Sequence, residues 1–372
     1  MTGIDASRLL PAIVVVASVA GLVGCGSTPA PVASGTVIEV PGATAEGNDY
    51  MNTLYRNALD SGKTDAVLYG ASASSAAGMF AKFSERFPGI SIVPQDAPDS
   101  QILTKLQVEA ESGNRLADLY TGGVSSVTAV AQVPDVCTRA DVRTAPADFA
   151  LPYSANDLVL TYNKRFFGFV YNTDMVSEED APRSWGDLLD PQWKDKLVMG
   201  DPTVVGGLRY VLTSLLVPES ADTWGETYLT ELAEQNVNIA ESEPSVPSDV
   251  ASGRFPVGVG VFSGYYQAQK TKGAPIDMVF PLDDGGNFLS SAGICAVRDA
   301  PDNDAASLYL NWLFTPEGQQ VLAEVDNGFG LVPGSPGPLG SPPLSEISTL
   351  PATNTDPSFN ARYFATIDQL FT

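Results

Sequence analysis

The distribution of apolar residues predicts alternating strands and helices along the first part of the chain. Short runs of β-branched and aromatic residues are typical of strands, and apolar residues spaced three or four positions apart are typical of amphipathic helices. The order is strand, helix, strand, helix and strand, which predicts a sheet with crossover helices. The segments, in that order, are "DAVLYG", "SSAAGMFAKFSERF", "ISIVPQ", residues 100–112 and "ADLYTGG".

A second set of strand-like and helix-like segments follows, and the chain then returns to the first. Two β-like runs, "DLVLTYN" and "FGFVYN", are separated by Lys164-Arg165-Phe166. The later run "SSAGICAV" and the helices "AASLYLNWLF" and "TPEGQQVLAEV" are expected to rejoin the first unit, with Thr315 as the cap of the last helix. We therefore predict an α/β protein with two lobes, a hinge and a cleft between the lobes.

This pattern divides the chain into six parts. The boundaries are 1–24 for a signal peptide, 25–49 for a lipid-anchored flexible linker rich in Ser, Thr, Pro and Gly, 50–160 for the first part of lobe 1, 161–278 for lobe 2, 279–335 for the return to lobe 1, and 336–372 for a C-terminal extension.

The N-terminal segment predicts an exported lipoprotein. The apolar run from Leu9 to Gly24 is too short for a membrane span but has the length of a signal-peptide core. It ends in Leu22-Val23-Gly24-Cys25, which resembles the bacterial lipobox and implies cleavage before Cys25 and attachment of a diacylglyceryl group, with chains such as palmitate, to its sulfur. The mature protein would then be anchored by lipid on the extracytoplasmic side of the cell membrane. An uncleaved anchor and an ordinary secretory signal are the alternatives.

Two cysteines remain in the mature chain, Cys137 and Cys295. An even pair in an oxidising compartment is compatible with a disulfide, but the sequence leaves open whether the two residues approach each other. The chain has no histidine to activate a thiol, which argues against a catalytic cysteine.

Composition narrows the function classes. The 372 residues carry 44 acidic and 20 basic side chains, a formal net charge of −24, which disfavours binding to nucleic acids and anionic lipid surfaces. The absence of histidine and of a G-x-S-x-G motif argues against a hydrolase with an activated nucleophile, and a carboxylate pair of the glycosidase type stays open. A surface lipoprotein without a transport role is the third class.

Several motifs together resemble the extracellular solute-binding proteins of ABC importers, in the group that includes ferric-iron, thiamine, phosphonate and sugar-phosphate binders. The motifs are "FGFVYNTDMV", "SWGDLLDPQWKDKLVMGDP", "GAPIDMVFPLDDGG" and "LNWLFTPEGQQVLAEVDNGFGLVP". The resemblance implies a type II-like binding protein, not an enzyme, that is a monomer and closes on its ligand by a hinge motion. Its partners would be a small-molecule or metal-chelate ligand and a membrane permease with ATPase subunits.

The tandem Tyr265-Tyr266 is where iron binders of this group place two phenolate ligands. The first loop, residues 71–75, has no His or Tyr, and residues 201–207 have no Tyr, so the resemblance implies only part of a ferric site. Ferric iron as the transported ligand, held by Tyr265 and Tyr266, is therefore the alternative. No resident cofactor is expected.

The preferred hypothesis is a small organic anion such as a phosphonate or a sugar phosphate. Small hydroxyl and glycine residues precede three predicted helices, whose free N–H groups favour anions. Ordinary helix capping is the competing explanation for Ser72, Ser74 and Thr203, and a hinge or surface charge is the competing explanation for Arg165. The predicted ligand-binding residues are Ser72, Ser74, Thr121, Gly122, Thr203, Gly206, Ser263, Tyr265 and Tyr266.

Overall fold

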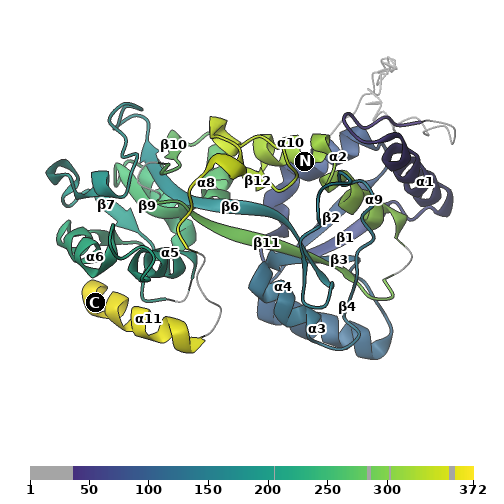
Figure 1. Ribbon diagram of the computed structural model, residues 1–372, viewed down its shortest axis with the longest axis horizontal. Coiled ribbons are helices and arrows are strands. Elements are labelled where there is room, and N and C mark those ends of the chain that lie inside the picture. The colour runs from purple at the N-terminus through teal and green to yellow at the C-terminus, as the bar shows by residue number, and fades with distance from the viewer. Residues whose placement is uncertain (1–36, 205, 283–285, 301–302, 352–356) are drawn as a thin grey trace, which may run out of the picture. The chain divides into compact units, whose positions relative to one another are not determined.

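One mixed sheet organises the computed structural model, which describes residues 37–204, 206–282, 286–300, 303–351 and 357–372. Its main path runs β2-β1-β3-β11-β6-β9-β7-β8 (Figure 1). The strands are β1 Asp65–Gly70, β2 Ser91–Asp96, β3 Leu119–Gly123, β4 Cys137–Thr138, β5 Tyr153–Ser154, β6 Val159–Asn172, β7 Leu197–Met199, β8 Asn238–Ile239, β9 Val257–Phe262, β10 Ile276–Val279, β11 Phe288–Val297 and β12 Gly328–Gly330.

The sheet contains two parallel groups joined by two long antiparallel strands. Strands β2, β1 and β3 are parallel, as are β9, β7 and β8. Between them β11 pairs antiparallel with both β3 and β6, and β6 pairs antiparallel with β9 (Figure 1). This arrangement confirms the predicted α/β class with two lobes. The predicted boundaries between the lobes stay a prediction.

Strand β6 corrects one prediction. The sequence predicts two runs interrupted at Lys164-Arg165-Phe166, whereas the structure has one strand of 14 residues through this position. Polar side chains are tolerated in the middle because Arg165 has a buried carboxylate partner, Asp326. The strand also contains an irregularity, because Ala292 pairs with Asn163 and Gly293 pairs with Thr161, which leaves one extra residue in β6.

Helices pack against both groups of parallel strands. Crossover connections between parallel strands require them, and local caps fix several ends: Thr44 caps α1, and Gly62 ends it in the left-handed conformation. The α-helices are α1 Ala45–Ser61, α2 Ala77–Arg86, α3 Asp99–Ser112, α4 Val124–Ala131, α5 Gly207–Leu216, α6 Gly225–Glu234, α7 Val246–Ala251, α8 Ser263–Lys270, α9 Asp304–Leu313, α10 Pro316–Val325 and α11 Pro357–Phe371. Short 3₁₀ turns include η1 Ala73–Ala76, directly before α2, and η4 Glu243–Ser245, directly before α7.

Each parallel group has its own core. In the first, Tyr69, Leu106 and Val127 pack together under α3 and α4. In the second, the fully buried Trp185 packs edge-on against Phe169, with ring centroids 5.1 Å apart. Two separate cores are what two lobes require, because each lobe then keeps its shape when the strands between them bend.

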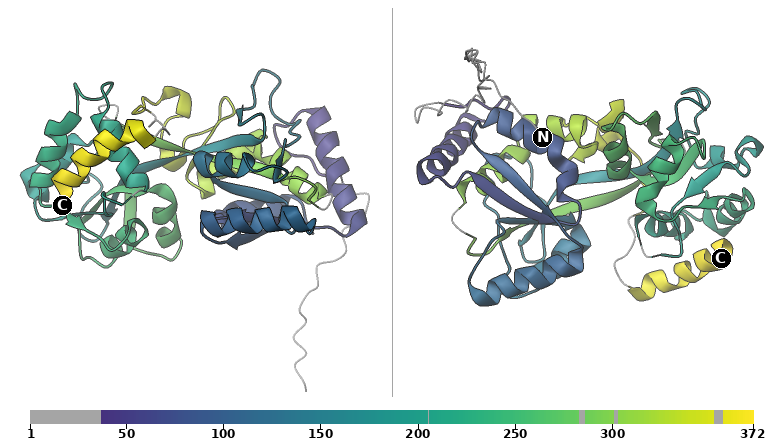
Figure 2. Two further views of the ribbon diagram at one scale, coloured as in Figure 1. Left: turned by 90° about the horizontal axis from the view of Figure 1, so that it is seen from below. Right: turned by 180° about the vertical axis from the view of Figure 1, so that it is seen from behind.

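The C-terminal residues are part of the second group. Helix α11 lies along α5 and α6 (Figure 2), and Ile367 is fully buried in the second core. Asp368 also accepts a hydrogen bond from Arg209 of α5 at 2.7 Å. The segment 336–372, predicted as an extension, therefore contributes a helix to the fold.

The start of the fold lies earlier than predicted. Helix α1 begins at Ala45, within the segment 25–49 predicted as a flexible linker, and Val40 is 1% exposed. Asn48 and Asn52 hold this segment through hydrogen bonds with the backbone of Val40 and Ile38. The predicted signal peptide and the lipidation residue Cys25 lie outside the described residues. Among the described helices, none has the length and hydropathy of a membrane span.

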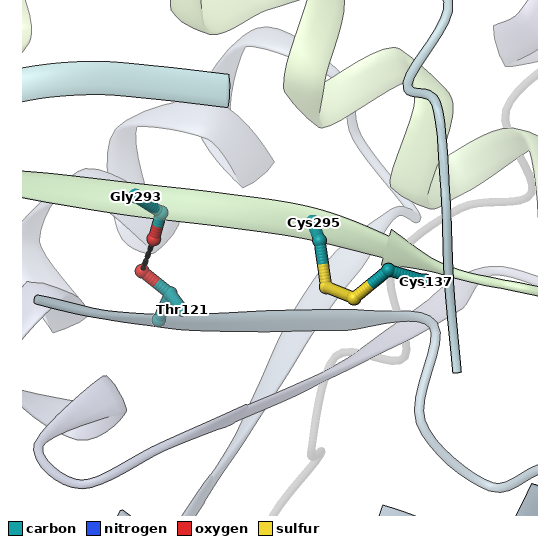
Figure 3. Close-up of a disulfide and its surroundings, with 4 residues drawn as sticks. All are labelled: Thr121, Cys137, Gly293 and Cys295. Carbon is teal, nitrogen blue, oxygen red and sulfur yellow. Dashed lines mark hydrogen bonds between the residues drawn. A yellow bond between two sulfur atoms is a disulfide. The ribbon is translucent and has the colours of Figure 1, made fainter. Parts of the chain in front are cut away.

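Cys137 and Cys295 form a disulfide that ties β4 to β11 (Figure 3). Their Cα atoms are 5.9 Å apart, and both side chains are buried. On the same strand, Gly293 accepts a hydrogen bond from the Thr121 hydroxyl at 3.0 Å (Figure 3). The cross-link and this hydrogen bond fix β11 against its neighbours on the first-lobe side.

Candidate functional site

A cavity of about 920 Å³ opens where the two parallel groups meet strands β6 and β11. Its size suits a small solute together with the water molecules around it. Residues from both lobes form the wall. They include Ser72 before η1 and Ser74 within it, Thr121–Gly123 of β3, Tyr162 and Arg165 of β6, Phe262, Gly264 and Tyr265 around the start of α8, Ser290–Ala292 of β11, and Tyr309 and Glu324 of α9 and α10.

The predicted site residues divide into two sets. Those that line the cavity are Ser72, Ser74, Thr121, Gly122 and Tyr265. Those that do not are Thr203, Gly206, Ser263 and Tyr266. The surroundings of these residues show what each of them contacts.

At the first predicted anion site, the chain supplies its own anion. The carboxylate of Asp96 accepts hydrogen bonds from the hydroxyl of Ser74 and from its backbone N–H, the latter at 2.9 Å. Ser72 has no capping hydrogen bond. A solute anion at this helix start would face the charge of Asp96, and the hydroxyl of Ser74 already has an acceptor. Ser74 lines the cavity, and its contact with a solute stays a prediction.

The predicted anion site of the second lobe, at the start of α5, is also occupied by a carboxylate of the chain. Thr203 donates its hydroxyl to Asp201 at 2.6 Å, which explains why it acts as a local turn residue. The backbone N–H of Leu208, in the first turn of α5, donates to the carboxylate of Glu243. Thr203 and Gly206 do not line the cavity, and the carboxylate of Glu243 occupies this helix start, so a solute contact at these residues stays a prediction.

The two neighbouring tyrosines point to different surroundings. Tyr265 lines the cavity, whereas the hydroxyl of Tyr266 donates to Asp277 at 3.2 Å and the residue is 3% exposed. Consecutive residues on a helix point about 100° apart, and here only Tyr265 faces the cavity. The clamp formed by both tyrosines stays a prediction. Ser263 is fully buried within the first turn of the same helix.

Helix α8 presents an open N-terminus to the cavity. Its cap residue Phe262 makes no side-chain capping bond, and Gly264 and Tyr265 line the cavity at the first turn. The first N–H groups of a helix have no partner within the helix, and they carry a partial positive charge. Gly264 is needed here, because a Cβ atom would lie 2.6 Å from the ring of Phe262 and 3.2 Å from an Arg165 nitrogen.

Arg165 brings a guanidinium to the same wall. Its side chain is 10% exposed and forms a buried ion pair with Asp326, which is 4% exposed. One terminal nitrogen binds Asp326, and the Nε atom has no hydrogen-bond partner among the described residues. Despite its burial, the pKa of Arg165 is raised by the negative charge of Asp326, so the guanidinium stays charged.

Three phenols complete this side of the cavity. Tyr162 lies 3.2 Å from the hydroxyl of Thr121, while the hydroxyls of Tyr265 and Tyr309 have no hydrogen-bond partner among the described residues. Burial raises the pKa of all three phenols above the ordinary value. They are therefore neutral at pH 7. The Thr121 hydroxyl donates to Gly293, so the proton of Tyr162 is directed to Thr121, whereas Tyr265 and Tyr309 can each donate one hydrogen bond to an anion.

Three carboxylates also line the cavity. They belong to Asp96, Asp99 and Glu324, and none of them forms an ion pair with a described Lys or Arg. Asp99 accepts a hydrogen bond from Tyr120 at 3.1 Å, which helps to fix its position. The cavity therefore presents both hydrogen-bond donors and carboxylates to a solute.

Sequence reasoning missed most of the donor side. Tyr162 and Tyr309 were not candidates, and Arg165 was weighed as a hinge charge. Positions 162 and 165 would lie on opposite faces of a regular strand. The extra residue of β6 changes the alternation, since Tyr162 is the residue left unpaired between Asn163 and Thr161. No pattern in the sequence marks this bulge.

A cavity whose wall comes from two α/β lobes is typical of proteins that bind a solute between the lobes and close by a hinge motion. The chain belongs to the bacterial extracellular solute-binding protein family, whose model matches residues 78–351. It is thus the extracytoplasmic solute-binding component of an ABC importer and not an enzyme, as the sequence predicted.

Relatives in the family are named for different solutes. The chain is 28% identical over 231 residues to an uncharacterized protein of Haemophilus influenzae, covering 59% of this chain and 64% of that protein. It is 27% identical over 238 residues to a Salmonella typhimurium protein named "Putative 2-aminoethylphosphonate-binding periplasmic protein", covering 61% and 69%. It is 22% identical over 178 residues to iron uptake protein A2 of Synechocystis, covering 45% and 50%.

Solved structures show the same fold. The periplasmic binding protein AfuA of Actinobacillus pleuropneumoniae, with fructose-6-phosphate bound, matches with a TM-score of 0.55 at 18% identity, covering 82% of this chain and 97% of AfuA. Iron-bound HitA of Pseudomonas aeruginosa matches with a TM-score of 0.57 at 17% identity, covering 83% and 100%. The predicted type II-like fold is confirmed by these matches.

Proposed function

We propose that this protein captures a small organic anion, a phosphonate or a phosphate ester, and delivers it to a membrane permease. The observation that carries the proposal is the open start of α8 beside Arg165. There, backbone N–H groups, a guanidinium and neutral phenols are available to one anionic group. Such groups bind phosphate and phosphonate oxygens well, because each oxygen accepts several hydrogen bonds.

The carboxylates in the cavity wall favour a solute that also carries an ammonium group. Asp96, Asp99 and Glu324 would attract a cation, and they would repel a second anion. A solute with a phosphonate at one end and an ammonium at the other can bind both the donors and the carboxylates of the cavity. 2-Aminoethylphosphonate has this chemistry, and the Salmonella relative is named for it.

Ferric iron is the second candidate. Tyr162, Tyr265 and Tyr309 together with Glu324 are oxygen donors of the kind that ferric iron prefers. Against it, burial raises the pKa of the phenols, so each would have to lose its proton against that shift. Within the described residues there is also no group of three His, Cys, Asp or Glu side chains placed to hold a metal.

Calorimetry and melting temperature test the proposal. Ligand-free protein that starts after Cys25 is titrated with 2-aminoethylphosphonate, methylphosphonate and ferric citrate. We expect saturable binding of 2-aminoethylphosphonate, tighter than that of methylphosphonate, and a stabilisation of about 2.7 kcal/mol at a hundredfold excess over Kd. A charge-transfer band with ferric citrate, and no heat with either phosphonate, would favour the iron candidate instead.

The two tyrosines give a matched prediction for the same titration. Tyr265→Phe removes a free hydroxyl from the cavity, and we expect the affinity for the phosphonate to fall about tenfold. Tyr266→Phe is the control, because its hydroxyl is bound to Asp277 outside the cavity, and its affinity should stay within twofold of wild type. Equal losses in both variants would show that the two phenols act together on the ligand.

Membrane attachment belongs to the same proposal. The lipobox-like sequence before Cys25 supports a lipid anchor, and the Ser- and Pro-rich residues that follow would hold the folded part away from the membrane. The partner is a permease with ATPase subunits, to which a monomer delivers the solute.

A further inference from the structure

The start of α5 is occupied by a carboxylate of the chain itself. Glu243, in η4, accepts hydrogen bonds from the backbone N–H groups of Gly207 and Leu208. These are the groups that would bind an anionic solute at a helix start. Glu243 is far from α5 in sequence, so it is not an ordinary cap from the residue before the helix.

Two glycines leave room for this side chain. A Cβ atom at Gly200 would lie 2.7 Å from Cγ of Glu243, and one at Gly206 would lie 3.2 Å from a carboxylate oxygen. At Gly207 a Cβ atom would be in ordinary contact with the other oxygen, 3.4 Å away, and would meet the ring of Phe167 at 2.3 Å. The absence of side chains at Gly200 and Gly206 therefore lets the carboxylate reach the start of α5.

The occupied space is connected to the cavity wall through aromatic side chains. Phe167, which lies against Gly207, packs on Phe262 at 5.3 Å, and Phe262 packs on Tyr265 at 5.4 Å. Phe262 and Tyr265 line the cavity, whereas Glu243 does not. Burial and, to a smaller extent, the negative charge of Glu243 raise the pKa of Tyr265.

We propose that Glu243 is a specificity-determining residue, because it fills the second-lobe anion site and restricts the solute to one anionic group, held by α8 and Arg165. This inference rests on the proposed function. A solute with a second phosphate would meet the charge of Glu243 where the fold otherwise offers free N–H groups.

The test uses inorganic phosphate as the probe and the melting temperature as the readout. Glu243→Ala removes the internal anion, and we expect its melting temperature to fall by about 3 °C from the lost cap. Added phosphate should then raise the melting temperature of Glu243→Ala by more than it raises that of wild type, because phosphate can enter the vacated space. In a titration with methylphosphonate, wild type should correspondingly bind one anion and Glu243→Ala should bind two.

Two further variants make the result decisive. Asn303→Ala removes a side-chain cap from α9, where Asn303 accepts from Ala305 and Ala306, and phosphate should give it only the wild-type increase. Glu243→Gln keeps the shape and a hydrogen-bond acceptor, so it should also show only the wild-type increase. An equal phosphate effect in wild type and Glu243→Ala would overturn the inference, and so would an extra effect in Glu243→Gln or Asn303→Ala.

The outcome is separable from that of the proposed function. Suppose that wild type binds no phosphonate, while phosphate still raises the melting temperature of Glu243→Ala more than that of wild type. In that case the proposed function fails, and the role of Glu243 as the internal anion of α5 remains. If wild type binds one phosphonate and Glu243→Ala gains nothing from phosphate, only the specificity role fails.

Discussion

Replacing Asp326 with Ala should lower the free energy of unfolding by about 3–5 kcal/mol, because it leaves the Arg165 guanidinium buried without its partner. The two side chains are 10% and 4% exposed, so water cannot replace the lost carboxylate easily. Arg165 is charged in both states, which means that its desolvation is no longer offset in the folded variant. Chemical denaturation, followed by tryptophan fluorescence, measures the change.

Two comparisons check this reason. Glu85→Ala breaks the exposed ion pair with Lys82 and should leave the midpoint nearly unchanged, because both side chains are largely in water. The double variant Arg165→Met with Asp326→Leu removes both charges and should recover most of the stability, while phosphonate binding is lost. A small effect of Asp326→Ala would mean that the pair is not buried as described.

Removing the disulfide should lower the free energy of unfolding by about as much as Asp326→Ala does. Cys137 and Cys295 are 158 positions apart, and closing so long a loop lowers the entropy of the unfolded chain. The loop model gives roughly 5 kcal/mol for this length, and native disulfides typically contribute 2–5 kcal/mol, so Cys137→Ala with Cys295→Ala should cost about 3–5 kcal/mol. The measurement is denaturation of wild type and of the double variant, each with and without reductant.

Reductant is the control for that prediction. It should bring wild type close to the double variant and leave the double variant unchanged, since both then have an open chain. If reductant shifts neither protein and their midpoints agree, the two cysteines are not cross-linked in solution.

The sequence was informative where local pattern decides structure. Strands such as β1 and β3, and helices such as α2 and α3, follow from periodicity and caps, and they occur at the expected places. Family motifs identified the class of protein. Helix α11 was missed, because its burial depends on α5 and α6, which are more than 120 residues away in the chain.

The site was only partly predictable from the sequence, because several of its residues are positioned by contacts with distant segments of the chain. Ser74 and Gly206 lie at helix starts, as expected, but Asp96 and Glu243 reach these starts from distant segments and occupy them. Tyr162 faces the cavity where β6 has its extra residue, and Arg165 is held there by Asp326. Such arrangements depend on tertiary pairing, which local sequence does not encode.

The central claim is that the wall formed by α8 and Arg165 holds the anionic group of a small organic solute. Calorimetric titration of ligand-free wild type with 2-aminoethylphosphonate tests it most directly, with Tyr265→Phe and Tyr266→Phe measured alongside. The account predicts one saturable site that is weakened about tenfold by Tyr265→Phe only. No heat with the phosphonate, together with a tyrosinate-to-iron absorption band on addition of ferric citrate, would contradict it.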